Sequence, residues 1–408
     1  MIQFEAVHKR FPNGTTAVHD LSLDMPEGGV TVFVGSSGCG KTTSLRMINR
    51  MVDPSSGTIR VGGRDVLEQD AAELRRSIGY VIQQAGLFPH RTVLDNVATV
   101  PLLLGWGRKK ARVAAGELLE RVGLSAEMGK RYPHQLSGGQ QQRVGVARAL
   151  AADPPVLLMD EPFGAVDPVV RTQLQDELLR LQTELSKTIV FVTHDIDEAV
   201  RLGDRIAVFR EGGHLVQCAP PEELLARPAD EFVADFLGAE RGLKLLSLST
   251  LADVAQGAAP EGGAWELVLD EGRKPVAWRE RDGGGEAPVR ALRDGDSLLS
   301  ALNESVASPS GLVVRVDADG VFTGVSSRDD VHERSGRAHS DAQSGATPRG
   351  SAPDPAAQSP QGLDLAAPAL DDAEEAGGAE TAGGVEAEVG ETADGVEAET
   401  GEKAGGGA

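Results

Sequence analysis

The spacing of apolar residues divides the chain into three parts. From the N-terminus to "FVADFLG" (232–238), short apolar runs alternate with stretches of helical spacing. This alternation predicts an α/β fold in which helices cover the faces of a mostly parallel sheet. From 243 to 333 the expected strands and helices are shorter and more weakly patterned. We expect residues 334–408, which carry no periodic pattern, to be disordered.

The strongest local signal is "VTVFVGSSGCGKTT" (30–43), a β-branched run followed by a glycine-rich turn and a helix. From Gly35 to Thr42 it matches G-x-x-x-x-G-K-[ST]. The glycines let backbone N–H groups surround phosphates, Lys41 reaches the outer phosphates, and the Thr42 hydroxyl suits Mg²⁺. We therefore predict a nucleotide phosphate site. The residues assigned to it are Gly35, Ser36, Ser37, Gly38, Cys39, Gly40, Lys41, Thr42 and Thr43.

A second buried strand, "PVLLMDEP" (155–162), ends in two adjacent carboxylates. In open α/β sheets, ligands lie beyond the carboxyl ends of the strands, so Asp160 is placed to hold Mg²⁺. Successive side chains of a strand alternate in direction, so Glu161 points elsewhere and can polarise an attacking water. The alternative is a solvated acidic turn, which is less favoured because the same chain carries a phosphate-binding loop.

Two further strands deliver polar side chains to the same edge. "TIVFVTHD" (188–195) ends at His194, for which we expect contact with a phosphate or a water. "IGYVIQQ" (78–84) ends at Gln83, whose amide can bridge a metal, a water and a moving neighbour. The alternatives are a structural histidine and an ordinary loop amide.

The segment "HQLSGGQQQR" (134–143) opens a second helix suited to an anion. Ser137 can cap the helix, while Gly138 and Gly139 leave its N–H groups accessible to a phosphate. An ordinary capped helix is the alternative. Phe11, in "HKRFPNG", is an exposed-looking aromatic that either stacks on a purine or packs within its strand.

Composition and charge argue against a nucleic-acid-binding, a secreted or a membrane-spanning protein. The net charge is −22, which argues against binding nucleic acid through a broad basic surface. Two cysteines fit a reducing cytoplasm. We expect no signal peptide, because the start "MIQFEAVHKRF" has charges where an apolar stretch is needed. We also expect no membrane span, because "VATVPLLLGW" (97–106) is too short. Much of the charge lies in residues 350–408, which hold fourteen Asp and Glu and one Lys. We interpret this tail as a solubilising or interaction segment.

In their order and spacing, "GSSGCGKTT", "LSGGQQQR", "VLLMDEP", "GAVDP" (164–168) and "FVTHD" resemble the nucleotide-binding subunit of ATP-binding cassette (ABC) transporters. The resemblance covers about residues 1–238. It implies a P-loop NTPase core with a helical subdomain, and ATP and Mg²⁺ as ligands.

The resemblance also implies a role for each motif. The roles are Walker A for Gly35–Thr43, metal binding for Thr42, Asp160 and Gln83, catalysis for Glu161, His194 and Gln83, adenine stacking for Phe11, signature contacts for Ser137, Gly138, Gly139 and Gln140, and a D-loop ending at Asp167. Two subunits would face head to tail, so that the Ser137 helix of one closes on the ATP held by Lys41 of the other.

Residues 78–106 and 160–182 look most like ATPases of bacterial importers for glycine betaine, carnitine and choline. Such a protein would work at the cytoplasmic face of the membrane with permease subunits and an extracytoplasmic binding protein. Other small solutes (amino acids or polyamines), a soluble ABC-type ATPase and a P-loop kinase are the alternatives. The kinase does not explain "LSGGQ".

Residues 243–333 resemble a degenerate pair of cystathionine-β-synthase (CBS) modules. "VRALRDGDSLLSALNESVASPSGLVVRVDADGVFTGVSSRDDV" (289–331) predicts a strand, a helix capped near Asp296 and two strands around Asp319 and Gly320. A shortened preceding copy, 246–256 with 264–280, lacks a convincing central helix. A regulatory role and a dimer-packing role both stay open.

Overall fold

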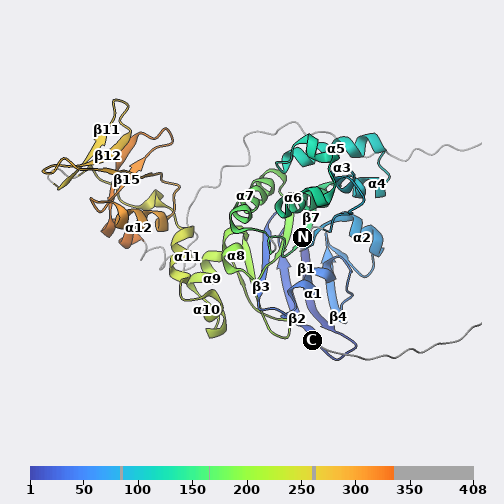
Figure 1. Cartoon of the computed structure of the whole chain (residues 1–408). Coiled ribbons are helices and arrows are strands. Elements are labelled where there is room, and N and C mark those ends of the chain that lie inside the picture. Colours follow the sequence, from blue (N-terminus) through green and yellow to red (C-terminus); the bar gives the residue numbers. More distant parts are fainter. Residues whose placement is uncertain (83–85, 165, 260–262, 335–408) are drawn as a thin grey trace, which may run out of the picture. The chain divides into compact units, whose positions relative to one another are not determined.

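The computed structural model describes residues 1–82, 86–164, 166–259 and 263–334 (Figure 1). The predictions for Gln83 and for the acidic tail beyond residue 334 fall outside the described residues.

A six-stranded sheet, in the order β10-β9-β3-β8-β7-β6, forms the centre of the N-terminal part. Five neighbouring strands run parallel and β10 pairs antiparallel with β9. The predicted mostly parallel sheet is therefore confirmed. The strands are β3 (Val30–Gly35), β6 (Ile78–Val81), β7 (Val156–Asp160), β8 (Thr188–Val192), β9 (Arg205–Arg210) and β10 (His214–Ala219).

A four-stranded sheet, β2-β1-β4-β5, lies in the same part of the chain and is antiparallel throughout. This sheet was not predicted from the sequence. Its pattern was available, because β1 and β2 alternate buried and exposed positions along much of their length. Its strands are β1 (Ile2–Arg10), β2 (Thr16–Met25), β4 (Ser56–Val61) and β5 (Arg64–Asp65).

The central strand β3 explains how the layers hold together. Its alternate residues Val32 and Val34 belong to one hydrophobic cluster with helices α6 (Gly138–Leu150) and α7 (Pro168–Leu185). Phe33 belongs to a second cluster, with the antiparallel sheet and helix α1 (Lys41–Ile48). Both faces of the strand are buried, as its continuous β-branched run predicts.

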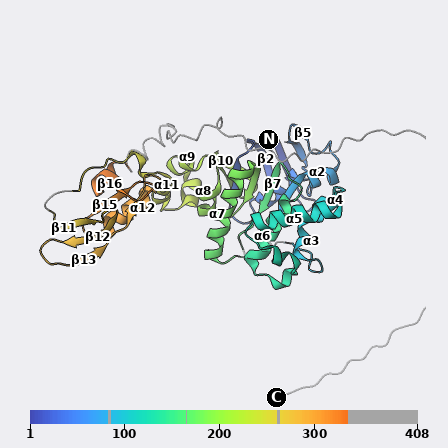
Figure 2. The same cartoon turned by 90° about the horizontal axis from the view of Figure 1, so that it is seen from above.

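Helices α3 (Val93–Val97), α4 (Thr99–Leu103), α5 (Arg108–Arg121) and α6 contact one another and form a helical group, visible in teal in Figures 1 and 2. The remaining N-terminal helices are α2 (Ala71–Ser77), α8 (Ile196–Leu202), α9 (Pro221–Ala226) and α10 (Glu231–Leu237).

Helix α11 (Arg241–Leu248) begins two residues before the expected boundary at 243. Its Leu245 is 4% exposed and belongs to the same cluster as α6 and α7, while Leu246 packs against a separate cluster formed by residues 251–331. The helix therefore serves two cores, which the spacing of its leucines did not reveal.

The C-terminal part contains two three-stranded sheets. One is the antiparallel sheet of β11 (Trp265–Leu269), β12 (Pro275–Glu280) and β13 (Glu286–Pro288). In the other, β15 (Leu312–Val316) pairs parallel with β14 (Ala291–Leu292) and antiparallel with β16 (Phe322–Ser327). The predicted order of strand, helix and two strands is found, with α12 (Leu298–Ala307) as the helix. Its cap is Ser297, next to Asp296 as expected, and the Asp296 carboxylate accepts a hydrogen bond from the Arg293 N–H.

Candidate functional site

Three neighbouring strands end at one edge of the six-stranded sheet. Phe33 of β3 pairs with Val192 of β8, which pairs with Asp160 of β7. Because these strands are parallel, the turns that follow them leave the sheet on the same side. The glycine-rich turn, the paired carboxylates and His194 are therefore brought together from segments far apart in the sequence.

The glycine-rich turn contains positions where only glycine fits. At Gly35 a Cβ atom would lie 2.3 Å from the Phe209 carbonyl oxygen, and at Gly40 it would lie 2.1 Å from the Ala17 carbonyl oxygen. Gly40 also has φ +93°, a left-handed conformation, directly before α1. The predicted strand, turn and helix are present, and residues 36–38 of the turn are exposed directly before the N-terminus of α1, where an anion can bind.

Lys41 is 6% exposed and lies folded onto this turn. Its Nζ donates hydrogen bonds to the carbonyl oxygens of Gly35 (2.8 Å) and Ser36 (2.9 Å) and lies 3.8 Å from Cys39 Sγ. Burial raises the pKa of Cys39, with the lysine opposing that rise. The turn thus holds one positive charge at its centre, where it complements phosphate.

Thr42 and Asp160 form an oxygen pair suited to Mg²⁺. The Thr42 hydroxyl donates to Asp160 Oδ1 at 2.8 Å, and Asp160 is 6% exposed. Within the described residues no three His, Cys, Asp or Glu side chains converge as a metal site. Mg²⁺ commonly takes one or two protein oxygens and completes its shell with water and substrate phosphates, so this small donor set fits the ion.

Two residues that the sequence analysis missed also contact Asp160. The Tyr80 hydroxyl lies 3.4 Å from Oδ2, and Arg46 Nη2 lies 3.7 Å from the same oxygen. Burial raises the pKa of Tyr80, which keeps the phenol protonated. Arg46 lies four residues after Thr42, on the same face of α1, so helical spacing alone would have indicated it.

Glu161 and His194 face each other across the edge. His194 Nδ1 lies 3.4 Å from Glu161 Oε2, and the His194 side chain is 62% exposed. Glu161 has φ +45°, and its N–H donates to the Val192 carbonyl at 2.9 Å. A left-handed glutamate is strained and needs surrounding structure to hold it. The arrangement places a carboxylate and an imidazole where they can share a proton with a water or a substrate oxygen.

The N-terminus of α6, the second helix end predicted to bind an anion, is closed by a capping box. Ser137 Oγ accepts from the Gln140 N–H at 3.3 Å, and Gln140 Oε1 accepts from the Ser137 N–H at 3.0 Å. Gly138 is open, whereas a Cβ at Gly139 would meet Val170 of α7 at 2.6 Å. The two glycines thus differ: one faces solvent and the other permits close packing of α6 against α7.

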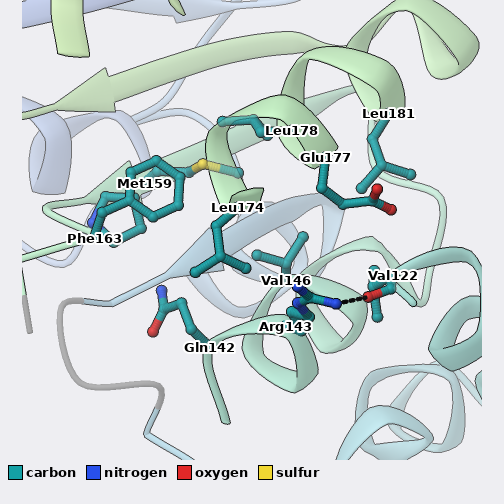
Figure 3. A pocket seen from close by; sticks show the side chains of 11 residues that line it. Val122, Gln142, Arg143, Val146, Met159, Phe163, Leu174, Glu177, Leu178 and Leu181 are labelled. Atoms are coloured by element: carbon teal, nitrogen blue, oxygen red, sulfur yellow. Dashed lines mark hydrogen bonds between the residues drawn. The ribbon is translucent and has the colours of Figure 1, made fainter. Parts of the chain in front are cut away.

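An apolar pocket is lined by residues of both α6 and α7 and is shown in Figure 3. Gln142 is 3% exposed there, and its Nε2 has no hydrogen-bond partner in the described structure. Most of the pocket lining is aliphatic or aromatic, and it includes none of the predicted site residues. It belongs to the packing of α6 rather than to the candidate site. The side chains labelled in the figure are Val122, Gln142, Arg143, Val146, Met159, Phe163, Leu174, Glu177, Leu178 and Leu181.

Two other predicted residues occupy turns. Asp167 caps α7, because its Oδ1 accepts from the Val169 N–H at 2.9 Å. Phe11 lies in the turn between β1 and β2, half-buried and outside the hydrophobic clusters, with Lys9 Nζ 5.2 Å from its ring centroid. Its ring face is thus at the surface rather than in the core.

Comparison with known proteins agrees with this geometry. Residues 18–164 match the ABC transporter family. The chain is 45% identical to the osmoprotectant import ATP-binding protein OsmV of Salmonella typhimurium, over 81% of this chain and 94% of that protein. The matched region is longer than residues 1–238, so it extends into the C-terminal part of this chain. It is 54% identical to the glycine betaine/carnitine/choline transport ATP-binding protein OpuCA of Bacillus subtilis, over 59% of this chain and 63% of that protein.

A solved structure is also similar. The dimeric, post-hydrolysis structure of the ATP-binding cassette MJ0796 bound to ADP and Pi matches with a TM-score of 0.50 and 35% identity. The match covers 54% of this chain and 98% of that one. None of the helices in the described residues is long and apolar enough to cross a bilayer.

Proposed function

This chain belongs to the ABC transporter family, as a transporter ATPase, and on that premise we propose that it powers the import of small quaternary amines such as glycine betaine, carnitine or choline. The observation that carries the proposal is the 45% identity to OsmV across almost the whole of that protein, including the part beyond residue 238. The family match and the phosphate-loop geometry support ATP as the nucleotide.

In this proposal the residues at the sheet edge divide the work of hydrolysis. Lys41 and the loop N–H groups hold the phosphates, while Thr42 and Asp160 hold Mg²⁺, which supplies charge neutralisation when bound. Glu161 accepts the proton of the attacking water. His194, 3.4 Å from that carboxylate, orients it and the transferring group. Phe11 stacks on the base, and Gln83 also takes part in the metal site and in catalysis.

The proposal includes a head-to-tail dimer. Each chain has two helix N-termini suited to phosphate, that of α1 at Lys41 and that of α6 at Ser137. The glycine-rich loop with Lys41 is enough to hold the phosphates of one ATP, so the second N-terminus is available to another chain. Two chains facing each other give each ATP both N-termini, with Gly138, Gly139 and Gln140 beside Ser137 and the Asp167 segment at the junction. The dimeric state of the MJ0796 structure supports this arrangement.

Permease subunits and an extracytoplasmic binding protein complete the proposed importer. The chain would lie at the cytoplasmic face of the membrane through its permease contacts. For the C-terminal part we propose a degenerate CBS-like pair: β14, α12, β15 and β16 support one copy, whereas β11 to β13 form a meander with no helix between them in the described residues. Its role would be regulatory or in dimer packing.

An uptake experiment tests the proposal. In a host lacking this gene, the wild-type protein should restore uptake of labelled glycine betaine at high salt. Glu161→Gln should not, because the base is lost, and its purified form should bind ATP but hydrolyse it at least about a hundredfold more slowly.

Glu117→Gln, on the exposed side of α5, is the matched control and should behave as wild type. Restored uptake of an amino acid or a polyamine instead of any quaternary amine would overturn the proposed cargo. Wild-type hydrolysis by Glu161→Gln would overturn the assigned base.

A further inference from the structure

A charged cleft lies behind the loop that carries His194. It has a volume of about 410 Å³ and is bounded by helices α7, α8 and α11. Its charged lining residues are Arg171, Asp195, Asp197, Glu198, Arg201 and Lys244. None of these was identified in the sequence analysis, yet Asp195 directly follows His194 in the chain.

Arg171 connects two helices across this cleft. Its Nη1 lies 3.6 Å from Asp195 Oδ2 and its Nε lies 3.8 Å from Glu198 Oε1. The Nε atom is buried and has no hydrogen-bond partner in the described structure. The guanidinium is therefore within ion-pair distance of two carboxylates without a close hydrogen bond to either.

The Glu198 carboxylate holds the His194 loop, and the Asp195 carboxylate ties the end of that loop to α8. The Thr193 hydroxyl donates to Glu198 Oε2 at 2.7 Å and accepts from the Asp195 N–H at 3.0 Å. Asp195 Oδ1 caps α8 through the Asp197 N–H at 2.8 Å. His194 thus lies between two residues whose positions depend on the carboxylates that Arg171 approaches.

Arg171 is also tied to the segment that precedes α7. Its backbone N–H donates to the Asp167 carbonyl at 2.8 Å, the ordinary hydrogen bond of the first turn of α7, so the Arg171 side chain extends from that turn. A planar guanidinium bonds two carboxylate oxygens in a fixed orientation, which an ammonium does not. The residue therefore has the chemistry and the place to transmit the position of α7 to the histidine loop.

We propose that Arg171 is a positioning residue for ATP hydrolysis, which holds the His194 loop in register with the start of α7 through Asp195 and Glu198. This inference rests on the proposed function, because it takes His194 to act in ATP hydrolysis. It assigns no contact between Arg171 and ATP. Loss of the guanidinium lowers turnover by freeing His194, and it leaves nucleotide binding intact.

The chain offers a matched control on the same two helices. Arg201 of α8 pairs with Asp176 of α7 at 2.6 Å, with side chains 41% and 61% exposed. Arg201→Ala removes an α7–α8 ion pair of the same chemistry that involves neither Asp195 nor Glu198. It should leave the hydrolysis rate within about twofold of wild type, as a surface pair contributes little.

The test is a double-mutant cycle in the full-length protein. Release of labelled phosphate is followed under single-turnover conditions for wild type, Arg171→Ala, His194→Ala and the double variant. Arg171→Ala should lower the rate about tenfold or more with an unchanged Kd for ATP. In the His194→Ala background it should cost less than about twofold, because a positioning effect vanishes with the group it positions. Arg171→Lys should recover part of the rate.

Each other outcome has a distinct meaning. Three outcomes would overturn the inference and leave the proposed function standing. The first is a set of rate losses that multiply in the double variant. The others are a rate loss in Arg201→Ala equal to that in Arg171→Ala, and weaker ATP binding by both Arg171→Ala and Arg171→Lys. A wild-type rate for His194→Ala would overturn the role of the histidine and the inference together. A wild-type protein without ATPase activity would instead overturn the proposed function.

Discussion

At the scale of single residues, the site depends on side chains held in unusual surroundings. Lys41 is almost fully buried although it is charged, and Glu161 adopts a left-handed backbone. Glu198, 7% exposed, is a third case, since it is a carboxylate beneath the His194 loop. Such groups cost folding free energy unless nearby partners compensate, and they concentrate where chemistry is expected.

Glu198 gives a pH prediction. Burial raises its pKa above the ordinary 4.5, and the Thr193 hydrogen bond and Arg171 oppose that rise. A raised folded-state pKa means that the folded protein binds the proton more tightly than the unfolded chain. The associated stability is therefore full below about 4.5 and is lost as the pH rises through the folded-state value.

Glu198→Gln does not titrate, so the free energy of unfolding of the variant minus that of wild type should increase with pH over this window. Urea unfolding of both proteins at several pH values from 4 to 7 measures the difference. Glu117→Gln, at an exposed glutamate of α5, is measured alongside as the control. A decrease with rising pH for Glu198→Gln would show that ion pairing, rather than burial, dominates at this position.

At the scale of elements, strands and helices of the N-terminal part follow their apolar pattern closely, and the exceptions lie where one element serves two neighbours. Helix α11 is the clearest example, because Leu245 packs in the cluster of α6 and α7 while Leu246 contacts the C-terminal cluster. Adjacent leucines pointing to different cores cannot be separated by periodicity alone. The part of the chain that packs with the ATPase core thus extends past residue 238.

Substitution within α11 tests this packing. Leu245→Ala should lower the free energy of unfolding by about 2–5 kcal/mol, because it leaves a cavity at a buried position. Leu243→Ala, at a leucine that is 46% exposed, should change it by less than about 0.5 kcal/mol. Urea unfolding followed by circular dichroism compares them. Equal effects of the two substitutions would show that α11 is not part of the core.

At the scale of the whole molecule, the described residues contain two helix N-termini suited to phosphate, those of α1 and α6, and the glycine-rich loop with Lys41 precedes only the first. The proposed dimer would bring the N-terminus of α6, at Ser137, in one chain to the phosphates held by the other. A closed, water-excluding site of this kind exists only in the assembly, so closing and opening can move attached proteins. Hydrolysis should therefore depend on both chains.

Complementation tests the shared site. Lys41→Ala should lose ATP affinity, because the charge facing the outer phosphates is gone, and Ser137→Arg should bind ATP without hydrolysing it. In a mixed dimer, one of the two sites combines an intact Lys41 with an intact Ser137. Mixing the two inactive proteins should therefore restore up to about a quarter of the wild-type ATPase rate, measured as phosphate release.

Each variant mixed with itself is the control and should stay inactive. If no mixing ratio restores hydrolysis, the shared-site arrangement is wrong.

The sequence by itself determined the local motifs: the turn from Gly35 to Lys41, the cap at Ser137 and the two carboxylates at the end of β7. Backbone geometry over a few residues sets these, and neighbours in the chain supply it. Tertiary structure alone decided that Thr42 meets Asp160 at 2.8 Å, that Tyr80 contacts the same carboxylate, and that Arg171 reaches the His194 loop. Those contacts depend on strand order and helix packing, and the free energy that selects them comes from burying apolar surface between segments distant in the chain.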